Sequence, residues 1–330
     1  MEINVKPIVE QFDYILSKSY LRFYRERNSL IVFLFHTLLR DKTEIRKNLI
    51  YPGTHEEITI KHFRRFIEFF LDHNYLFITP EDILNGLNKE KKYALITFDD
   101  GYYNNINALP ILNEYKVPAV FFVSTNHIKY NKCFWADVLY REGVRQGKLI
   151  KEISREVHHF KKEKTKKVEK YFLKNFGKKA FQPKSDIDRP FTPSELKDFS
   201  REKYVFLGNH TREHAILTNY STEEIRKQIL GAQEDIFEIT AKRPKIISYP
   251  NGSYSNRTIR ISREIGMKLG ISVIQKKNYL QINLMSNESM RLGRFVLHGD
   301  RDLRKQCEVI RSDISLKTLY NRLKSSINSR

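Results

Sequence analysis

The chain has 330 residues, and 40% of them are hydrophobic, so it can bury a sizeable core as one large domain or as a domain with insertions. Its formal net charge of +20 attracts anions such as phosphate groups, nucleic acid or an anionic lipid surface, without choosing among them. Its two cysteines show no paired spacing, which excludes a disulfide framework and argues against a thiolate zinc site.

The start of the chain and its apolar runs bear on where the protein works. Residues 1–6 lack the basic and apolar regions of a signal peptide. The longest apolar runs, such as residues 30–35, are too short to span a bilayer. We therefore expect a soluble cytoplasmic protein, with peripheral contact with an anionic membrane as an open alternative.

Short, continuous apolar runs recur along the chain and predict strands that are buried on both faces. They cover residues 30–35, 94–98, 119–123, 204–207, 246–249, 270–274 and 295–298. Helical patterns lie between several of these runs, over residues 60–70, over 225–239 behind a capping box at 221–224, and over 255–265 before Gly266. Alternating strands and helices indicate a parallel α/β fold, which we expect to be barrel-like.

Residues 141–180 interrupt this alternation with 14 Lys and Arg against 5 Asp and Glu. We predict one or two helices here, ended by Gly177 and Pro183, as an insertion between barrel units rather than a separate domain. A solvated helical face is one interpretation of the charge. The other is a surface that meets phosphate groups on a substrate or a lipid.

Two carboxylates, Asp99 and Asp100, directly follow the apolar run 94–98 and precede Gly101. Adjacent side chains of a strand point to opposite faces, but a turn at Gly101 allows both carboxylates to face one cavity. The carboxyl ends of barrel strands hold the active site in (β/α) barrels. One carboxylate could then bind a metal while the other moves a proton. The alternative is an ordinary Asp-Asp-Gly turn.

A second polar cluster, with His210 and His214, follows the apolar run 204–207. On a helical turn these positions share a face, so both imidazoles can reach one ion. Thr211 can cap this turn or form a hydrogen bond nearby. With a carboxylate at another strand end, the set leaves coordination positions open for water and substrate. Two surface histidines are the alternative, and we interpret Glu213 as a surface residue.

A third polar loop follows the run 246–249, where Pro250 and Gly252 shape a tight turn. Such a loop can direct a backbone N–H, that of Asn251, at a developing oxyanion. An ordinary turn of an α/β unit explains the loop equally well.

These clusters resemble the motifs of one family. Thr97-Phe98-Asp99-Asp100-Gly101 resembles the first motif of the NodB-like polysaccharide deacetylases, carbohydrate esterase family four. Residues 210–214 fit the H-[S/T]-x-x-H motif of that family, and residues 249–254 resemble the YPxGxY variant of its third motif. Phe35-His36 resembles a "YH" element and Arg294-Phe295 a late "RI" element. We interpret His36 as a histidine of the barrel mouth or core rather than a ligand.

The resemblance implies roles for the metal site and the base. Asp99 would be the catalytic base that activates water, and Arg294 would orient it and keep it ionised. Asp100, His210 and His214 would hold a divalent metal ion, commonly Zn²⁺, that polarises the acyl carbonyl.

The resemblance implies less about the oxyanion and the second proton. The metal and the backbone at Asn251 would hold the oxyanion. His298 is the candidate proton donor, although the spacing Leu297-His298 departs from the L-x-x-H motif of the family. A structural histidine is the alternative for His298.

The resemblance covers residues 30–300 and implies a distorted (β/α) barrel of the NodB type with a basic helical insertion at about residues 135–200. Residues 1–29 and 301–330 are then expected to be helical extensions. The implied function is metal-dependent deacetylation of an N-acetylated or O-acylated sugar in surface-polysaccharide or glycolipid metabolism. The net charge of +20 and the lack of an export signal make a phosphate- or lipid-linked sugar the candidate substrate. A deformylase or other deacylase acting on a lipid- or nucleotide-linked sugar, and a catalytically silent carbohydrate-binding relative, are the alternatives. No nucleic-acid motif is present, so no nucleic-acid partner is expected.

Overall fold

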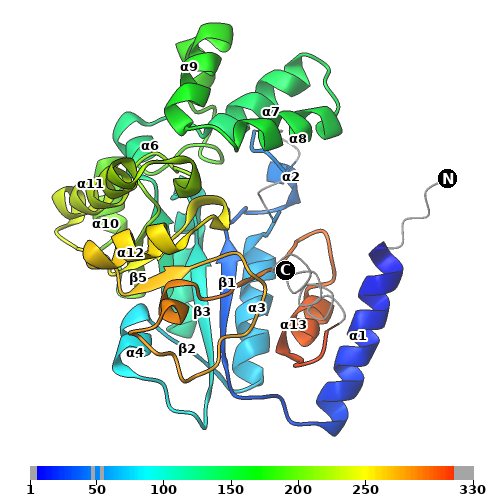
Figure 1. Ribbon diagram of the computed structural model, residues 1–330. Helices are drawn as coiled ribbons and strands as arrows, with labels where there is room; N and C mark the ends of the chain where they lie inside the picture. Colours follow the sequence, from blue (N-terminus) through cyan, green and yellow to red (C-terminus); the bar gives the residue numbers. More distant parts are fainter. Residues whose placement is uncertain (1–5, 46–48, 53–55, 316–330) are drawn as a thin grey trace, which may run out of the picture.

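A computed structural model describes residues 6–45, 49–52 and 56–315 of the chain. Figure 1 shows a curled sheet surrounded by helices, with α7, α8 and α9 grouped beyond one end of it. The strands are β1 (Leu30–Phe35), β2 (Tyr75–Phe77), β3 (Lys92–Phe98), β4 (Ala119–Val123), β5 (Val205–Asn209), β6 (Ile246–Ser248), β7 (Leu269–Ile271) and β8 (Phe295–Val296).

Most of the helices lie between consecutive strands along the chain. They are α1 (Lys6–Phe23), α2 (Lys42–Ile45), α3 (Ile60–Asp72), α4 (Pro80–Asn85), α5 (Leu109–Tyr115), α6 (Thr125–Tyr130), α7 (Trp135–Arg145), α8 (Ile150–Phe160), α9 (Thr165–Phe176), α10 (Pro193–Phe199), α11 (Thr222–Thr240), α12 (Asn256–Glu264) and α13 (Leu303–Arg311). Short 3₁₀ turns include η3 (Leu217–Asn219) and η4 (Pro250–Gly252). None of the helices that the structure describes is long and apolar enough to cross a membrane.

The strands pair in parallel in the order β7-β6-β5-β4-β3-β1-β8, and β2 pairs with the start of β3. One late segment joins the two edges of this sheet. Leu292 forms a parallel bridge with Ile271 of β7, and Phe295 of β8 pairs with Phe33 of β1. This arrangement confirms the predicted distorted (β/α) barrel. Parallel strands place all their carboxyl ends at one edge of the sheet, which is where Asp99, Asp100 and His210 lie, after β3 and β5.

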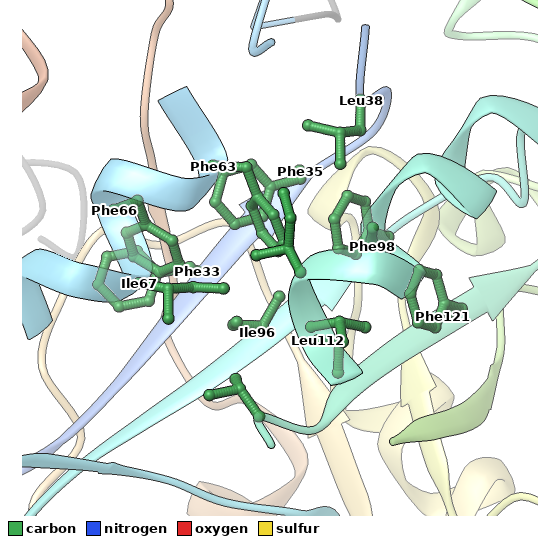
Figure 2. Close-up of a cluster of buried hydrophobic side chains, with 14 of the residues drawn as sticks. Phe33, Phe35, Leu38, Phe63, Phe66, Ile67, Ile96, Phe98, Leu112 and Phe121 are labelled. Carbon is green, nitrogen blue, oxygen red and sulfur yellow. The ribbon is translucent and has the colours of Figure 1, made fainter. Parts of the chain in front are cut away.

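Alternate side chains of a strand enter two different layers. From β1, Phe33 and Phe35 belong to the cluster under the outer helices, whereas Val32 belongs to a second buried cluster with Leu95 and Phe122. Figure 2 shows Phe33 and Phe35 beside the aromatic side chains of α3. The rings of Phe33 and Phe66 are 4.6 Å apart in an edge-to-face arrangement, which fixes α3 on the outside of the sheet.

Residues 141–180 hold two complete helices, α8 and α9, as predicted, together with the end of α7, which begins at Trp135. Gly177 ends α9 as expected. The three helices bury their own apolar cluster, which includes Trp135, Ile153 and Phe172.

Strand ends also depart from the predicted limits. β5 continues to Asn209, because Gly208 and Asn209 pair with Phe122 and Val123 of β4. Gly208 allows this close approach, since a Cβ atom there would lie 2.2 Å from the Phe122 ring. Tyr75–Phe77 forms a strand that the apolar pattern did not reveal.

The two predicted extensions contribute helices to the described residues. α1 lies beside α13 at one side of the barrel (Figure 1). The division of the chain at residues 29 and 300 stays a prediction, and residues 1–5 and 316–330 lie outside the described residues.

Candidate active site

Asp100, His210 and His214 come together at the carboxyl ends of β3 and β5. Nε2 of His210 and Nε2 of His214 each lie 3.3 Å from Oδ1 of Asp100. One potential ligand atom from each of the three residues lies within 4.8 Å of the others. Residues about 110 positions apart in the chain therefore form one cluster with the composition of a divalent metal site.

The backbone turns sharply after β3 and aims both carboxylates. Asp100 has φ of 73° and Gly101 has φ of 79°. Both angles lie in the left-handed region, which is energetically unfavourable for any residue that carries a side chain. The amide of Asp99 still donates to the carbonyl of Phe35, 2.9 Å away, so the strand ladder continues up to Asp99. As predicted from Gly101, Asp99 and Asp100 both face the site.

The segment that carries His210 and His214 is a loop, so the predicted helical turn is wrong. Thr211 and His214 have φ of 62° and 48°. The loop amides are satisfied from outside it: the amide of Arg212 donates to the carbonyl of Gln228 and the amide of Glu213 to its side-chain oxygen. Contacts with α11 thus replace the hydrogen bonds that a helix would supply.

Two side chains in this loop have structural roles. Oγ1 of Thr211 accepts a hydrogen bond from the amide of Ala215 at 2.8 Å, in line with the prediction that Thr211 bonds nearby. Glu213 is buried and accepts a hydrogen bond from Nε2 of Gln228 at 2.9 Å. The interpretation of Glu213 as a surface residue is therefore wrong, because it anchors the loop to α11.

Both imidazoles are prepared to act as ligands. Nδ1 of His210 lies 2.8 Å from the carbonyl oxygen of Ser248, so the ring donates there and leaves the lone pair of Nε2 toward Asp100. Burial lowers the pKa of His214 to about 4, although the charge of Asp100 acts to raise it. The His214 ring is therefore neutral at pH 7.

Asp99 is bound by Arg294 in the barrel interior, and both side chains are buried. Nη1 of Arg294 donates to Oδ1 of Asp99 at 2.8 Å, and Nη2 donates to Oδ2 at 2.5 Å. The hydroxyl of Ser248 also donates to Oδ2 at 3.0 Å. Burial alone would raise the pKa of Asp99, but the charge of Arg294 outweighs it and lowers the pKa below its usual value.

Oδ2 of Asp99 lies 3.8 Å from Nε2 of His210, next to the metal-type cluster. A carboxylate that stays ionised beside a potential metal ion can accept a proton from water bound there. Arg294 uses both Nη atoms on Asp99, a geometry that lysine could not reproduce.

His36 lies at the end of β1, beside Asp99 at the end of β3, because Phe35 and Phe98 are paired across the two strands. Its Nδ1 lies 2.6 Å from Oε1 of Glu56, and its amide donates to the other oxygen of Glu56. Burial alone would lower the pKa of His36, but Glu56 and then Asp100 and Asp99 raise it to about 9. The imidazole is therefore protonated at neutral pH. Its position directly after β1, outside the Asp100 cluster, agrees with the interpretation of His36 as a histidine of the barrel mouth.

Lys161, directly after α8, is a half-buried residue whose charge interacts with that of Asp100. Nδ2 of Asn219 in η3 donates to the carbonyls of Lys161 and Glu163, at 2.9 and 3.1 Å, which holds the end of α8 over the loop after His214. Burial lowers the pKa of Lys161, and the charge of Asp100 acts in the opposite direction. Lys161 forms no ion pair with the acidic side chains of the described residues.

The two remaining predicted residues lie at different places. Asn251 lies in η4 with φ of 57°, directly after the end of β6. The amide of His298 donates to Oε1 of Gln306 on α13, and its carbonyl accepts from Nε2 of Gln306. His298 is not part of the Asp100 cluster, and these bonds hold it to α13.

Sequence reasoning did not identify Glu56 or Lys161, and it placed His36 at the barrel mouth without giving it a chemical role. The Phe35-His36 element after an apolar run was the available signal for His36. Glu56 and Lys161 follow no strand end, and their place depends on how loops and helices fold back.

The residues fit a resident divalent metal ion. Oδ1 of Asp100 is buried and has no hydrogen-bond partner in the described part of the chain, which is costly for a carboxylate unless a cation satisfies it. Burial raises the pKa of Asp100, but the positive charges that His214, His210 and His36 carry when protonated outweigh burial and hold the pKa well below its usual value. An ionised carboxylate with two imidazoles is a donor set that suits Zn²⁺.

Comparisons with known proteins agree with this fold. The sequence model of the polysaccharide deacetylase family matches residues 86–270. YxkH of Bacillus subtilis (strain 168), which is named as a polysaccharide deacetylase, is 20% identical over 228 residues. That match covers 68% of this chain and 61% of YxkH, so it spans less than two thirds of the relative.

Solved structures share the fold. The Streptococcus pyogenes deacetylase PplD, solved in complex with acetate, has a TM-score of 0.56 at 16% identity over 86% of this chain and 99% of its own. A de-N-acetylase from Aggregatibacter actinomycetemcomitans has a TM-score of 0.59 at 14% identity over 86% of this chain and 100% of its own. With the family model matching more than half of its length, the chain belongs to the polysaccharide deacetylase family.

Proposed function

We propose that the chain is a metal-dependent deacetylase that removes the acetyl group from an N-acetylated, or O-acylated, sugar. The observation that carries this proposal is the juxtaposition of Asp100, His210 and His214 with an Asp99 that Arg294 keeps ionised. The family of the chain and the solved deacetylases that share its fold support the same reaction class.

Asp100, His210 and His214 would hold the metal ion, and Zn²⁺ is the proposed ion because of the two imidazole ligands. When bound, it would supply Lewis-acid polarisation of the acyl carbonyl and lower the pKa of a water molecule. Its position would depend on Ser248, whose carbonyl fixes the orientation of the His210 ring.

Asp99 would accept a proton from the attacking water, whose oxygen forms a bond to the acyl carbon. The C–N bond of the amide then breaks, the acyl group leaves as acetate and the sugar nitrogen takes up a proton to leave as an amine. Arg294 acts through Asp99 by fixing the direction of its oxygens. The backbone N–H of Asn251 is the proposed donor to the oxyanion of the tetrahedral intermediate.

We propose His36 as the donor of the second proton, with His298 as the alternative that the sequence suggests. His36 is adjacent to Asp99 across paired strands and is protonated at neutral pH, because Glu56 raises its pKa. Nδ1 bonds to Glu56, so Nε2 is the proposed atom that gives its proton to the substrate.

For the substrate, we propose a sugar with an anionic group, such as a phosphate- or lipid-linked sugar of surface-polysaccharide or glycolipid metabolism. Lys161 supports this, because a half-buried ammonium beside the site without an acidic partner in the described residues would gain from an anion. The net charge of +20 favours the same class of substrate. A cytoplasmic location stays a prediction.

The test combines metal analysis with acetate release by the full chain. The purified protein is assayed on a lipid-linked N-acetyl sugar, a nucleotide-linked N-acetyl sugar and neutral chitin oligomers, with Asp99→Asn as the inactive control. We expect about one divalent ion per chain, acetate release from the anionic sugars, and none from Asp99→Asn.

Other outcomes would contradict specific parts of the proposal. Protein that binds no metal and gains no activity from added metal would overturn the metal-dependent mechanism. Release of formate in place of acetate would identify a deformylase that uses the same residues. Sugar binding without acyl release by the wild type would leave a silent carbohydrate-binding relative.

A further inference from the structure

Helix α1 exposes its apolar side chains to solvent. Phe12, Ile15 and Phe23 are 61%, 50% and 75% exposed, and Val9 and Leu16 are also exposed. Positions 9, 12, 16 and 23 follow the three- and four-residue spacing that puts side chains on one face of a helix. A continuous apolar stripe of this kind on a protein surface marks a contact site. We call Val9, Phe12, Ile15, Leu16 and Phe23 the α1 stripe.

The opposite, polar face of α1 is the one that contacts the protein. Asp13 and Ser17 are buried there. Asp13 accepts a hydrogen bond from the hydroxyl of Ser315 at 3.0 Å, and the hydroxyl of Ser17 donates to the carbonyl of Ile314 at 3.2 Å. A surface helix normally buries its apolar face, so these bonds hold α1 in the reverse orientation and keep the α1 stripe outward.

Basic side chains border the α1 stripe. Lys18, Arg22 and Arg25 are exposed and form no ion pair with any acidic side chain that the structure describes. The guanidinium of Arg22 lies 5.9 Å from the ring centroid of Phe23, next to the stripe. An apolar and aromatic face beside Lys and Arg is typical of a helix that lies in the interface of an anionic membrane.

A second copy of the chain fits this surface less well than a lipid surface. In a symmetric dimer the same surface would meet itself. The acidic side chain on the exposed part of α1, Glu10, already pairs with Arg301 at 2.9 Å. A second α1 would therefore bring no free carboxylate to Lys18, Arg22 and Arg25, whereas an anionic bilayer supplies phosphate groups.

We propose that α1 docks on an anionic lipid bilayer, with Phe12, Leu16 and Phe23 entering the boundary between headgroups and acyl chains. The 18 residues of α1 give a helix about 27 Å long, enough to lie along the surface. Lys18, Arg22 and Arg25 then contact lipid phosphates. This proposal rests on α1 alone and does not depend on the deacetylase activity.

The test is co-sedimentation of the full chain with vesicles of phosphatidylcholine, with and without phosphatidylglycerol, at low and high salt. We expect binding to the vesicles with phosphatidylglycerol, weakened by salt, and little binding to phosphatidylcholine alone. The triple variant Phe12→Ser, Leu16→Ser, Phe23→Ser should bind at least about tenfold less, since it removes apolar area that enters the bilayer. Its melting temperature should stay unchanged, because these side chains are exposed.

Leu149→Ser is the matched control, because Leu149 is 68% exposed but lies in the insertion. It should bind vesicles as the wild type does. Asp100→Asn should also bind vesicles as the wild type does. The test of membrane binding by α1 is therefore independent of the test of the proposed metal site. Absence of binding to phosphatidylglycerol, or equal binding by the triple variant, would overturn the proposal. A wild-type dimer that the triple variant converts to a monomer, without any lipid effect, would assign the α1 stripe to a second copy.

Discussion

Arg294 and Asp99 form a buried ion pair with two hydrogen bonds, although the two residues are 195 positions apart in the chain. The pair joins the segment before β8 to the end of β3 across the barrel interior. Breaking it by removing one partner leaves the other charge buried without compensation, which typically costs about 3–5 kcal/mol. The same pair thus stabilises the barrel and sets the ionisation of the proposed base.

Replacing Arg294 with Gln should therefore affect both activity and stability. Burial would then act unopposed on Asp99 and raise its pKa, so the acidic limb of the kcat/KM profile should move to higher pH. Arg294→Lys should recover part of the stability but little activity, because lysine lacks the paired donors. An unchanged pH profile in Arg294→Gln would show that Arg294 does not act through Asp99.

The lowered pKa of Asp99 also predicts how the stability of the fold depends on pH. The unfolded chain has the ordinary carboxyl pKa of about 3.9, so the pair stabilises the fold fully above that pH. This stability should be lost as pH falls through the lower pKa of the folded state. Acid unfolding of the double variant Asp99→Asn, Arg294→Gln should lack this contribution.

Asp100→Asn should remove bound metal and keep the fold. The amide retains the shape of the carboxylate, and Oδ1 of Asp100 has no hydrogen-bond partner in the described residues to lose. Metal analysis should fall from about one ion per chain to background, with acetate release lost. Chelation should lower the melting temperature of the wild type and not that of the variant.

The matched control for this change is Asp198→Asn, because Asp198 is an exposed acid away from the cluster. It should keep metal and activity. Full metal content in Asp100→Asn would exclude Asp100 as a ligand.

His36→Gln should remove the basic limb of the pH profile. His36 has a pKa of about 9, so wild-type kcat/KM should fall as the pH rises through about 9 and the proton is lost. The paired variant His298→Gln should keep that limb. The opposite result, with the limb lost in His298→Gln alone, would assign the second proton to His298.

The same raised pKa predicts the pH dependence of stability. Unfolded histidine has a pKa of about 6.5, so the pair between His36 and Glu56 contributes fully below that pH. The contribution should decline from there and be lost as the pH rises through about 9. Denaturant unfolding of the wild type and of His36→Gln across this range should measure the difference.

Lys161→Gln should weaken the use of anionic substrates selectively. Loss of one charge-assisted contact should raise KM for a phosphate-bearing sugar by about tenfold and leave neutral oligosaccharides unaffected. Lys162→Gln is the control, because Lys162 is exposed and adjacent. Equal effects on neutral and anionic substrates would show that Lys161 supports the loop and does not bind an anion.

The sequence predicted much of the site because local patterns specified it. Continuous apolar runs that end in polar residues marked β3 and β5, and parallel strands must bring such ends to one edge. Strand ends alone thus group Asp99 and Asp100 with His210 and His214. The turn at Gly101 was equally local, since its conformation follows from the absence of a side chain.

Where a partner is distant in sequence, local reasoning failed. The helical turn predicted for His210 and His214 is a loop because Gln228, on α11, satisfies its amides. The prediction for Glu213 failed for the same reason, since only the packing of α11 buries it. The place of Lys161 depends on Asn219, which binds the end of α8.

The sequence by itself therefore determined where β3 and β5 lie and which polar clusters follow them, and with these the fold and the metal-type cluster. The family resemblance already implied that Arg294 keeps Asp99 ionised, and only the tertiary structure decided the orientation of these side chains and the ionisation of His36. The low pKa of Asp99 requires Arg294, and the high pKa of His36 requires Glu56. Burial and Coulomb interactions depend on distances through space, which periodicity along the chain does not encode.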